Sequence, residues 1–278
     1  GAKLVDEIVQ VPVIEALRAR MVMGQLGATV LQGLSSNVSI PKVTAGASGS
    51  WVAENGAATE TDQTIGQVQL SPNTCAAHTD IGRRLLIQSS ADVESLIRND
   101  ITNSLAVAID SAAVNGGGSN EPTGVIQHTD VTTTSLGTNG GALTYAKLCD
   151  VEAAPENNNA AMGTMQFLTN AKVRKKLRQL EIATNSGLML FDWRYNTILG
   201  YPTTVANIVP SNLTKGTSTS GVLSGLIFGD FSQAVIAYFG PGIDILVDPY
   251  TGSSAGTVRV RALVDVDVNL RHAKAFSV

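Results

Sequence analysis

The most regular feature of the chain is an apolar stripe with helical spacing between residues 93 and 112. Its members recur three or four positions apart: Val93, Leu96, Ile97, Ile101, Leu105, Ile109 and Ala112. Ser89 and Ser90 supply capping side chains just before the stripe, and Asp92 adds the negative charge that favours a helix N-terminus. Asn115 and three consecutive glycines end the pattern. The stripe predicts one helix of about six turns.

The residues before position 39 have the pattern of an arm. Apolar side chains at helical spacing predict a short helix near the start: Val13, Ile14, Leu17 and Met21. Gly24 stands where this helix would stop, and residues 27–31 have the composition of a short strand.

Residues 39–83 contain many Gly, Ser and Thr and almost no aliphatic bulk between positions 44 and 64. The flanks at 38–43 and 67–70 have the pattern of strands, so the segment predicts a long two-stranded hairpin. An isolated hairpin is marginally stable in water, which favours a partner surface, plausibly on another copy of the chain. The alternative is a floppy surface loop, against which Trp51 argues because an indole is a typical interface anchor.

The second half of the chain alternates helix and strand patterns and then becomes rich in strands. Helices are expected at 144–156 and from an Asn170 cap through Ala183, with strands at 164–169 and 188–191. The tail predicts four further strands: 225–228, 234–238, 243–247 and 257–269. The sequence therefore predicts an α+β fold.

Composition narrows the classes of function. Only 15% of the residues are charged against 44% hydrophobic, while soluble proteins usually carry roughly 25% charged residues. The net charge of −4 gives no basic field of the kind that nucleic-acid binding through phosphates requires. The most apolar stretch, 226–247, contains Asp230 and Asp244 and is no membrane-spanning helix. We see no signal peptide, and a start at Gly1 without Met suggests trimming or a boundary of the expressed segment.

No arrangement of residues commits the chain to a reaction. The three histidines, His78, His128 and His272, form no metal-binding motif, and Cys75 and Cys149 are expected to be reduced thiols. The glycine run at 116–124 lacks phosphate-loop spacing and is interpreted as turns. Asp265 and Asp267 share one face of a strand and are interpreted as solvated edge charges, a cation or a basic partner being the alternative. We expect no enzyme, cofactor or metal.

The few charges are unevenly distributed. The hairpin carries three acids near its tip, with no Lys or Arg between Lys42 and Arg83, whereas one later helix carries five cations. Complementary charges on one chain favour association between copies. The candidate intersubunit contacts are Trp51, Glu54, Glu60, Asp62, Arg83 and Arg84. The candidates for contact with a neighbour or with a nucleic-acid backbone are Lys172, Arg174, Lys175, Lys176 and Arg178, although these also fit plain solvated faces.

The order of these elements resembles the major capsid proteins of tailed bacteriophages, the Hong Kong 97-like fold family. The matching segments follow the family's order over nearly the whole chain: Asn37–Pro41, Trp51–Glu54, Arg84–Ser90, Asp110 through Ile126, Leu199–Pro202, Phe228–Ser232 and Val247–Tyr250. Each segment is short and is not diagnostic alone, but the whole set in this order makes the resemblance specific.

The resemblance implies a division of the chain into an N-terminal arm (1–38), an extended loop (39–83), a peripheral domain with a spine helix (84–127), an axial domain (128–224) and return strands with the C-terminus (225–278). It implies a subunit that builds pentamers and hexamers of an icosahedral shell around double-stranded DNA in the virion, after assembly in the host cytoplasm. Portal, scaffold and maturation protease are implied partners, with a cement protein as a further candidate and no membrane.

The chain departs from some of these relatives at one point. They join subunits by an isopeptide bond from a lysine on the extended loop, but residues 43–82 contain no lysine and Lys42 lies at the base of the loop. We therefore predict a shell without covalent cross-links. Within the same fold the alternative is an encapsulin-like compartment shell. From other classes, the alternatives are a β-rich surface binding module and, with less support, an enzyme built on the 128–224 block.

Overall fold

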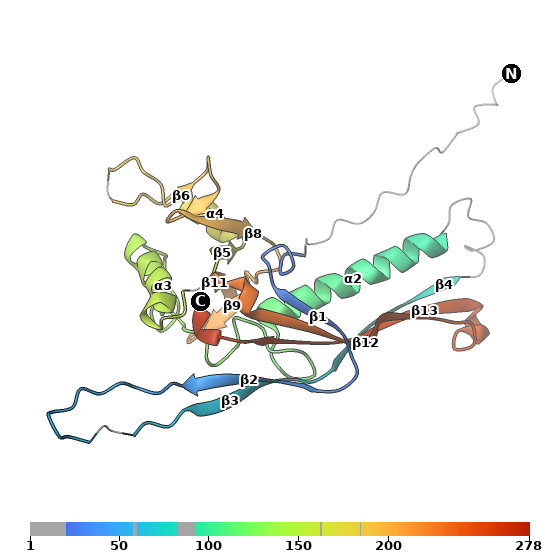
Figure 1. Ribbon diagram of the computed structural model, residues 1–278. Helices are drawn as coiled ribbons and strands as arrows, with labels where there is room; N and C mark the ends of the chain where they lie inside the picture. The colour runs from blue at the N-terminus through green and yellow to red at the C-terminus, as the bar shows by residue number, and fades with distance from the viewer. Residues whose placement is uncertain (1–20, 58–59, 83–92, 162, 184) are drawn as a thin grey trace.

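The computed structural model describes residues 21–57, 60–82, 93–161, 163–183 and 185–278. A long helix lies along one sheet, a second unit of sheet and short helices lies at one end, and a hairpin extends from the body (Figure 1). The mixed architecture confirms the α+β class. Most of the helix expected near Val13, the capping residues Ser89 and Ser90, and the candidate contacts Arg83 and Arg84 lie outside the described residues.

One sheet has four strands and carries the main core on one face. In spatial order these are β1 (Thr29–Leu34), β12 (Ala234–Asp248), β13 (Thr257–Leu270) and β4 (Asn73–Gly82). β1 is parallel to β12, and the other pairs are antiparallel. The helix α2 (Val93–Asn115) packs on this sheet through Ile101, Leu105 and Ile109, which confirms the predicted stripe. The two strands expected at 234–238 and 243–247 are one strand with an irregularity between Phe239 and Asp244.

The glycine run after α2 forms a tight backbone contact with the end of the helix. Val125 N donates to Ala113 O at 3.0 Å, and Ile126 N donates to Val114 O at 3.0 Å. Gly117 N donates to Glu121 Oε1 at 2.7 Å, which closes the intervening turn. The chain thus supplies donors to carbonyl groups that a helix end leaves unpaired. The expectation of turns in this segment is confirmed.

The predicted hairpin is present and its root is buried. β2 (Val38–Ala45) pairs with β3 (Thr64–Leu70) in antiparallel register. Leu70 packs with Val235, Ala237 and Phe239 on the four-stranded sheet. The hairpin ends at Leu70, earlier than the expected loop boundary at residue 83, because β4 pairs along its whole length with β13.

The second unit is a six-stranded sheet with two short helices. Its strands, in spatial order, are β14 (Phe276–Ser277), β11 (Leu226–Asp230), β5 (Met165–Thr169), β8 (Tyr201–Val205), β7 (Thr197–Ile198) and β6 (Phe191–Asp192). Its core centres on Phe167 and Phe228, whose rings lie 4.4 Å apart between centroids. β11 and β14 belong to this sheet, so its strands cross the expected boundary at residue 224.

The helices of this unit are α3 (Tyr145–Asn157), capped by Thr144, and α4 (Ala171–Leu177), capped by Asn170. α3 confirms the expectation, but α4 ends at Leu177 and not at Ala183. Ile182 N donates to Leu188 O at 2.8 Å and Leu190 N to Leu180 O at 2.9 Å, so the chain doubles back where the helix was expected to continue. The strand expected at 188–191 is reduced to β6. A two-stranded ribbon of β9 (Leu213–Lys215) and β10 (Ser218–Leu223) completes the unit.

The interpretation of Asp265 and Asp267 as solvated edge charges is wrong for Asp267. β13 lies inside the sheet, and Asp267 is buried. Its carboxylate accepts hydrogen bonds from Ser71 N at 2.8 Å and Val268 N at 2.9 Å. Asp265 accepts from the Thr74 hydroxyl of the adjacent strand. These side chains therefore join the start of β4 to β13.

Titration of Asp267 is expected to make stability depend on pH. Burial raises the pKa of this carboxyl despite the backbone hydrogen bonds that lower it. Between the ordinary and the raised pKa the folded chain holds a proton that the unfolded chain has released, so stability falls as pH rises through this range. Urea unfolding from about pH 4 to about pH 7 is expected to show the wild type losing stability relative to Asp267→Asn as pH rises. A pH-independent difference between the two would contradict this prediction.

Candidate intersubunit surfaces

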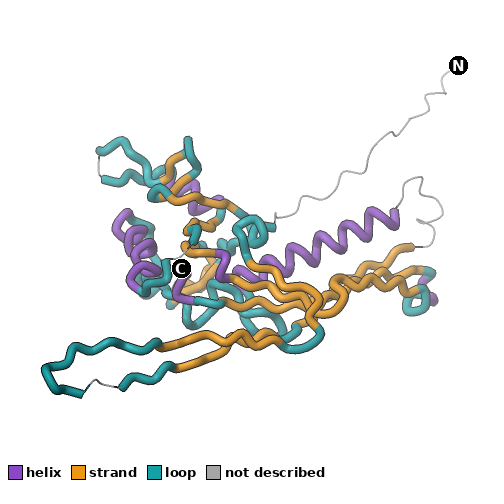
Figure 2. Tube along the Cα trace, in the orientation of Figure 1, coloured by secondary structure: helices purple, strands orange, loops and turns teal. Residues whose placement is uncertain are grey.

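The tip of the hairpin brings together four of the residues selected from the sequence. Trp51 is fully exposed at 104%, and Glu54, Glu60 and Asp62 are exposed as well. Gly56 N donates to Ala53 O at 2.8 Å, which forms a turn with Glu54 at its corner. The tip extends away from the body of the molecule (Figure 2). An exposed indole and three exposed carboxylates on one projecting hairpin are typical of a surface that becomes buried in an assembly.

The five cations expected on one helix do not form one patch. Lys172 and Lys176 lie one turn apart on α4 and border a cavity. Arg178, the residue after α4, places its guanidinium 5.9 Å from the centre of the Phe191 ring. Arg174 is half-buried and Lys175 is exposed. The cations therefore point in several directions, as the spacing predicts.

The cavity beside α4 has a volume of about 480 Å³ and is mainly apolar. Its walls come from segments far apart in the chain and include Leu136, Leu143, Val173, Val222, Leu223 and Val278. The lining includes three lysines, Lys172, Lys176 and Lys215, and no carboxylate side chain. We call it the lysine-rimmed cavity. The cavity was not predictable from the sequence, because no local pattern shows that these segments meet.

A second exposed apolar surface lies where the chain doubles back after α4. Trp193 is 66% exposed and Tyr195 78%, and both line a larger hollow of about 940 Å³. Its border has mixed charge, with Glu152, Asp192 and Arg194. These aromatic residues were not among the candidates chosen from the sequence, although a Trp next to an Asn-containing turn (Asn196, φ 54°) was a usable signal.

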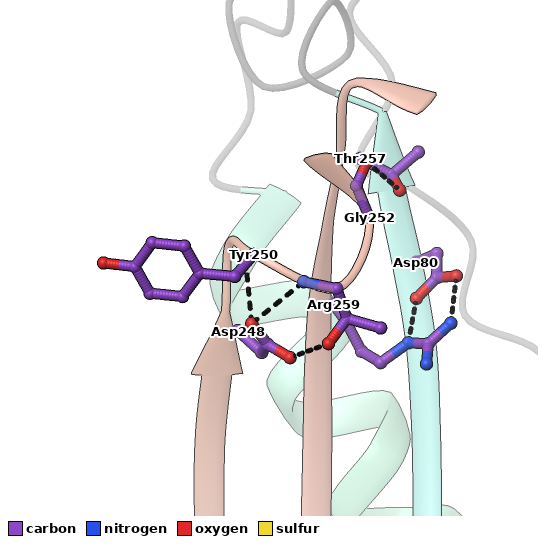
Figure 3. A network of polar contacts seen from close by, with 7 residues as sticks. Asp80, Asp248, Tyr250, Gly252, Thr257 and Arg259 are labelled. Atoms are coloured by element: carbon purple, nitrogen blue, oxygen red, sulfur yellow. Dashed lines mark hydrogen bonds and ion pairs between the residues drawn. The ribbon is translucent and has the colours of Figure 1, made fainter. Parts of the chain in front are cut away.

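A third projecting feature is the loop between β12 and β13. Figure 3 shows Asp248 accepting hydrogen bonds from Tyr250 N and Thr251 N, at 2.8 and 3.2 Å. Arg259 donates to both carboxylate oxygens of Asp80 at 2.7 and 2.8 Å, which joins β13 to β4 below the loop. Hydrogen bonds from Thr251 lower the pKa of Asp248, and the bond from Arg259 lowers the pKa of Asp80. The loop is thus held in one shape with Tyr250 exposed.

Other chemistry finds little support in the described residues. They contain no group of three or more His, Cys, Asp or Glu placed to hold a metal ion. None of the described helices is long and apolar enough to cross a membrane. Cys75 and Cys149 are free thiols. The surface features above are therefore the best candidates for function.

Two known phage proteins are similar to this chain in sequence. The major capsid protein of Halomonas phage phiHAP-1 is 32% identical over 271 residues, which are 95% of this chain and 41% of that protein. The major capsid protein of Klebsiella oxytoca phage phiKO2 is 24% identical over 244 residues, which are 85% of this chain and 55% of that protein. The chain thus spans less than two thirds of the length of each.

Solved structures share the fold at low sequence identity. A structure titled "Capsid of native GTA particle computed with C5 symmetry" superposes with a TM-score of 0.72 at 20% identity, over 95% of this chain and 91% of that one. A structure from Microbacterium phage Oxtober96 gives a TM-score of 0.70 at 16% identity, over 100% and 90% of the two chains. The fold is therefore the Hong Kong 97-like fold of phage capsids. The model of the Phage capsid family matches residues 1–278, and the chain belongs to this family.

Proposed function

We propose that this chain is a major capsid subunit that assembles with copies of itself into an icosahedral head around double-stranded DNA. The observation that carries the proposal is the projecting hairpin, whose tip exposes an indole and three carboxylates while its root is buried in the sheet. In an isolated molecule this tip leaves an apolar indole exposed to water, whereas a neighbouring copy would bury it. Family membership supports the same function.

The roles that we propose for the segments of the chain follow the family's architecture. Residues 1–38 act as an arm, the hairpin overlaps a neighbour, α2 and the four-stranded sheet form the peripheral plate, and the six-stranded unit closes rings of five or six copies. We propose adjusted limits for these segments, because β4 pairs within the four-stranded sheet while β11 and β14 pair within the six-stranded sheet. Repetition of these interfaces builds a closed shell.

We propose that the shell holds together without covalent bonds between subunits. The hairpin has no lysine beyond Lys42, which lies in β2 opposite Gly66, near its root. Stability is then left to hairpin overlap, arm contacts or a separate cement protein. By family resemblance we also propose a portal, a scaffold, a maturation protease and packaged DNA as partners, with assembly in the host cytoplasm and a structural rather than an enzymatic role.

The cationic residues that do not border the cavity are the proposed contacts to DNA or to a neighbour. They are Arg174, Lys175 and Arg178. Contact with DNA through these few charges would be independent of sequence and sensitive to salt.

Electron microscopy of the expressed chain is expected to show closed particles, and denaturing gels of those particles are expected to show the subunit only as a monomer. A variant in which a short glycine linker replaces residues 47–62 is expected to fold with an unchanged melting temperature and to form no particles. The removed segment lies beyond the paired strands, so its loss leaves the root of the hairpin intact.

Other outcomes identify the alternatives. A wild-type chain that stays monomeric under all conditions would favour the β-rich binding module. Particles that enclose an enzyme and no nuclease-resistant DNA would favour the compartment shell. Covalent ladders on denaturing gels would contradict the proposed absence of cross-links.

A further inference from the structure

We propose that the hairpin tip of one copy docks into the lysine-rimmed cavity of a neighbouring copy, with Trp51 in the apolar interior and the tip carboxylates at the lysines. This inference rests on the proposed function, because it requires assembly between copies. It adds the docking site and the pairing of charges to the general overlap proposed above.

The two surfaces are complementary in chemistry. The tip offers one exposed indole, and Glu54, Glu60 and Asp62 are exposed on the same segment. The cavity offers apolar walls in a volume of about 480 Å³, within the range of roughly 300–1,000 Å³ that is usual for sites that enclose a compact group. Three carboxylates therefore face three ammonium groups at its rim.

These charges are not already neutralised within the chain. Among the described residues, Lys172 donates only to Ser211 O at 3.3 Å, and Lys215 donates only to Ser135 Oγ at 3.5 Å. Ion pairs within the described chain involve neither the rim lysines nor the tip acids. Both sets of charges are therefore available to a partner.

The tip cannot reach the cavity of its own chain. Leu70 fixes the root of the hairpin on the four-stranded sheet. From the last strand pair, Ala45 with Thr64, the tip extends roughly 30 Å at about 3.3 Å per residue. In Figure 1 the tip lies well separated from α4 and β9, which border the cavity. The occupant is therefore the tip of a second copy.

The other hollows fit the tip less well. The hollow beside Trp193 has the carboxylates of Glu152 and Asp192 at its border, which would repel an acidic tip. The hollow beside β13 contains Glu121 and Asp267 and is mainly polar. A third hollow is lined by Lys42, Val43 and Thr44 of β2 itself, so the hairpin root already forms one of its walls. The lysine-rimmed cavity alone among these combines apolar walls with lysines and has no Asp or Glu in its lining.

Cysteine cross-linking tests the docking directly while leaving Trp51 and all the charges in place. In a chain with Cys75→Ser and Cys149→Ser, we introduce Val52→Cys next to Trp51 and Val222→Cys in the cavity wall. Both positions are exposed, at 50% and 61%. Mild oxidation or a short bismaleimide is expected to give covalent ladders between copies. The matched control pairs Val52→Cys with Leu188→Cys, which is 63% exposed beside the other hollow, and is expected to give none.

Charge reversal supplies an independent readout. Changing Lys172, Lys176 and Lys215 to Glu is expected to lower particle yield at least tenfold, and changing Glu54, Glu60 and Asp62 to Lys is expected to do the same. Combining both sets is expected to restore assembly, because the charges are exchanged across the interface. As a single-site comparison, Lys176→Glu is expected to lower the yield, whereas Lys274→Glu, an exposed lysine outside the cavity, is expected to leave it unchanged.

The outcomes separate this inference from the proposed function. Particles of the Val52→Cys, Val222→Cys variant that give no cross-link between these two positions overturn the docking and leave the shell function in place. Reversed charges that are not rescued by the combined variant, although each variant melts like the wild type, also overturn it. A chain that forms neither particles nor cross-links overturns both.

Discussion

Replacing Gly124 with alanine is expected to prevent stable folding of the chain. A Cβ atom at this position would lie 2.6 Å from the carbonyl carbon of Val114 and closer still to the backbone nitrogens of Asn115 and Gly116. These atoms belong to the end of α2 and cannot move aside like the end of a flexible side chain. We expect a cost of at least about 3 kcal/mol, the upper end of ordinary overpacking penalties.

The substitution is disruptive because the backbone around Gly124 passes close to the end of α2 and forms hydrogen bonds with it. Gly124 N donates to Gly116 O at 2.9 Å, and the following residues supply further backbone donors to the helix. Displacing Gly124 would break these bonds and disturb Val125, which is fully buried in the main core. Soluble yield and urea unfolding measure the effect. Gly82→Ala is the control, because no atom of the described residues lies within 4 Å of the added atom. Equal stability of the two variants would contradict this prediction.

Removing the carboxylate of Asp110 is expected to destabilise the attachment of the N-terminal part to α2. Asp110 is 5% exposed and accepts hydrogen bonds from Val22 N at 2.6 Å and Met23 N at 3.0 Å. Asp110→Ala leaves both buried amide groups without their acceptor, at a cost of about 2–5 kcal/mol. Urea unfolding measures the loss, and proteolysis before Gly24 is expected to become faster.

Two companion variants define the role of Asp110. Asp110→Asn keeps one acceptor oxygen and is expected to lose less stability than Asp110→Ala. Burial raises the pKa of Asp110, so a rise in pH through that pKa places a negative charge in the core and lowers the stability of the wild type. The Asp110→Asn variant carries no such charge and does not lose stability in this way. Asp244→Ala, on an exposed position of β12, is expected to change stability little. Equal losses in the Asp110→Ala and Asp244→Ala variants would show that the hydrogen bonds contribute nothing.

The elements that were predictable from the sequence are those specified by local patterns. The stripe from Ile101 to Ile109 reports a helix because only one side of α2 faces the sheet, and the break at Asn115 is visible in the same residues. The Asn170 cap predicts where α4 begins because the bond from Val173 N to its side chain is local. The same patterns did not predict where α4 ends. Leu180 and Leu190 meet across a turn, and that contact outweighs the helix preference of the residues between them.

The candidate site likewise has one part that was predictable from the sequence and one part that was not. Trp51 and the three acids of the tip were identified from composition alone, since a coreless segment with an indole is unusual in one stretch of chain. The lysine-rimmed cavity was not identifiable, because its walls are brought together from residues far apart in sequence, such as Leu136, Val173 and Leu223. Likewise, only the structure shows which of the five cations border the cavity and which do not.

By itself the sequence determined the helix, the hairpin, the strand-rich tail and the family resemblance, because periodicity, glycines and charge are properties of neighbouring residues. Only the tertiary structure decided which sheet each strand joins, as for β4 and β11, and that Asp267 is buried on an inner strand. These outcomes depend on pairing between residues that are distant in the chain, for which a local pattern carries no information about the partner. The surfaces that would join one copy to the next arise at the same level, from segments that only folding brings side by side.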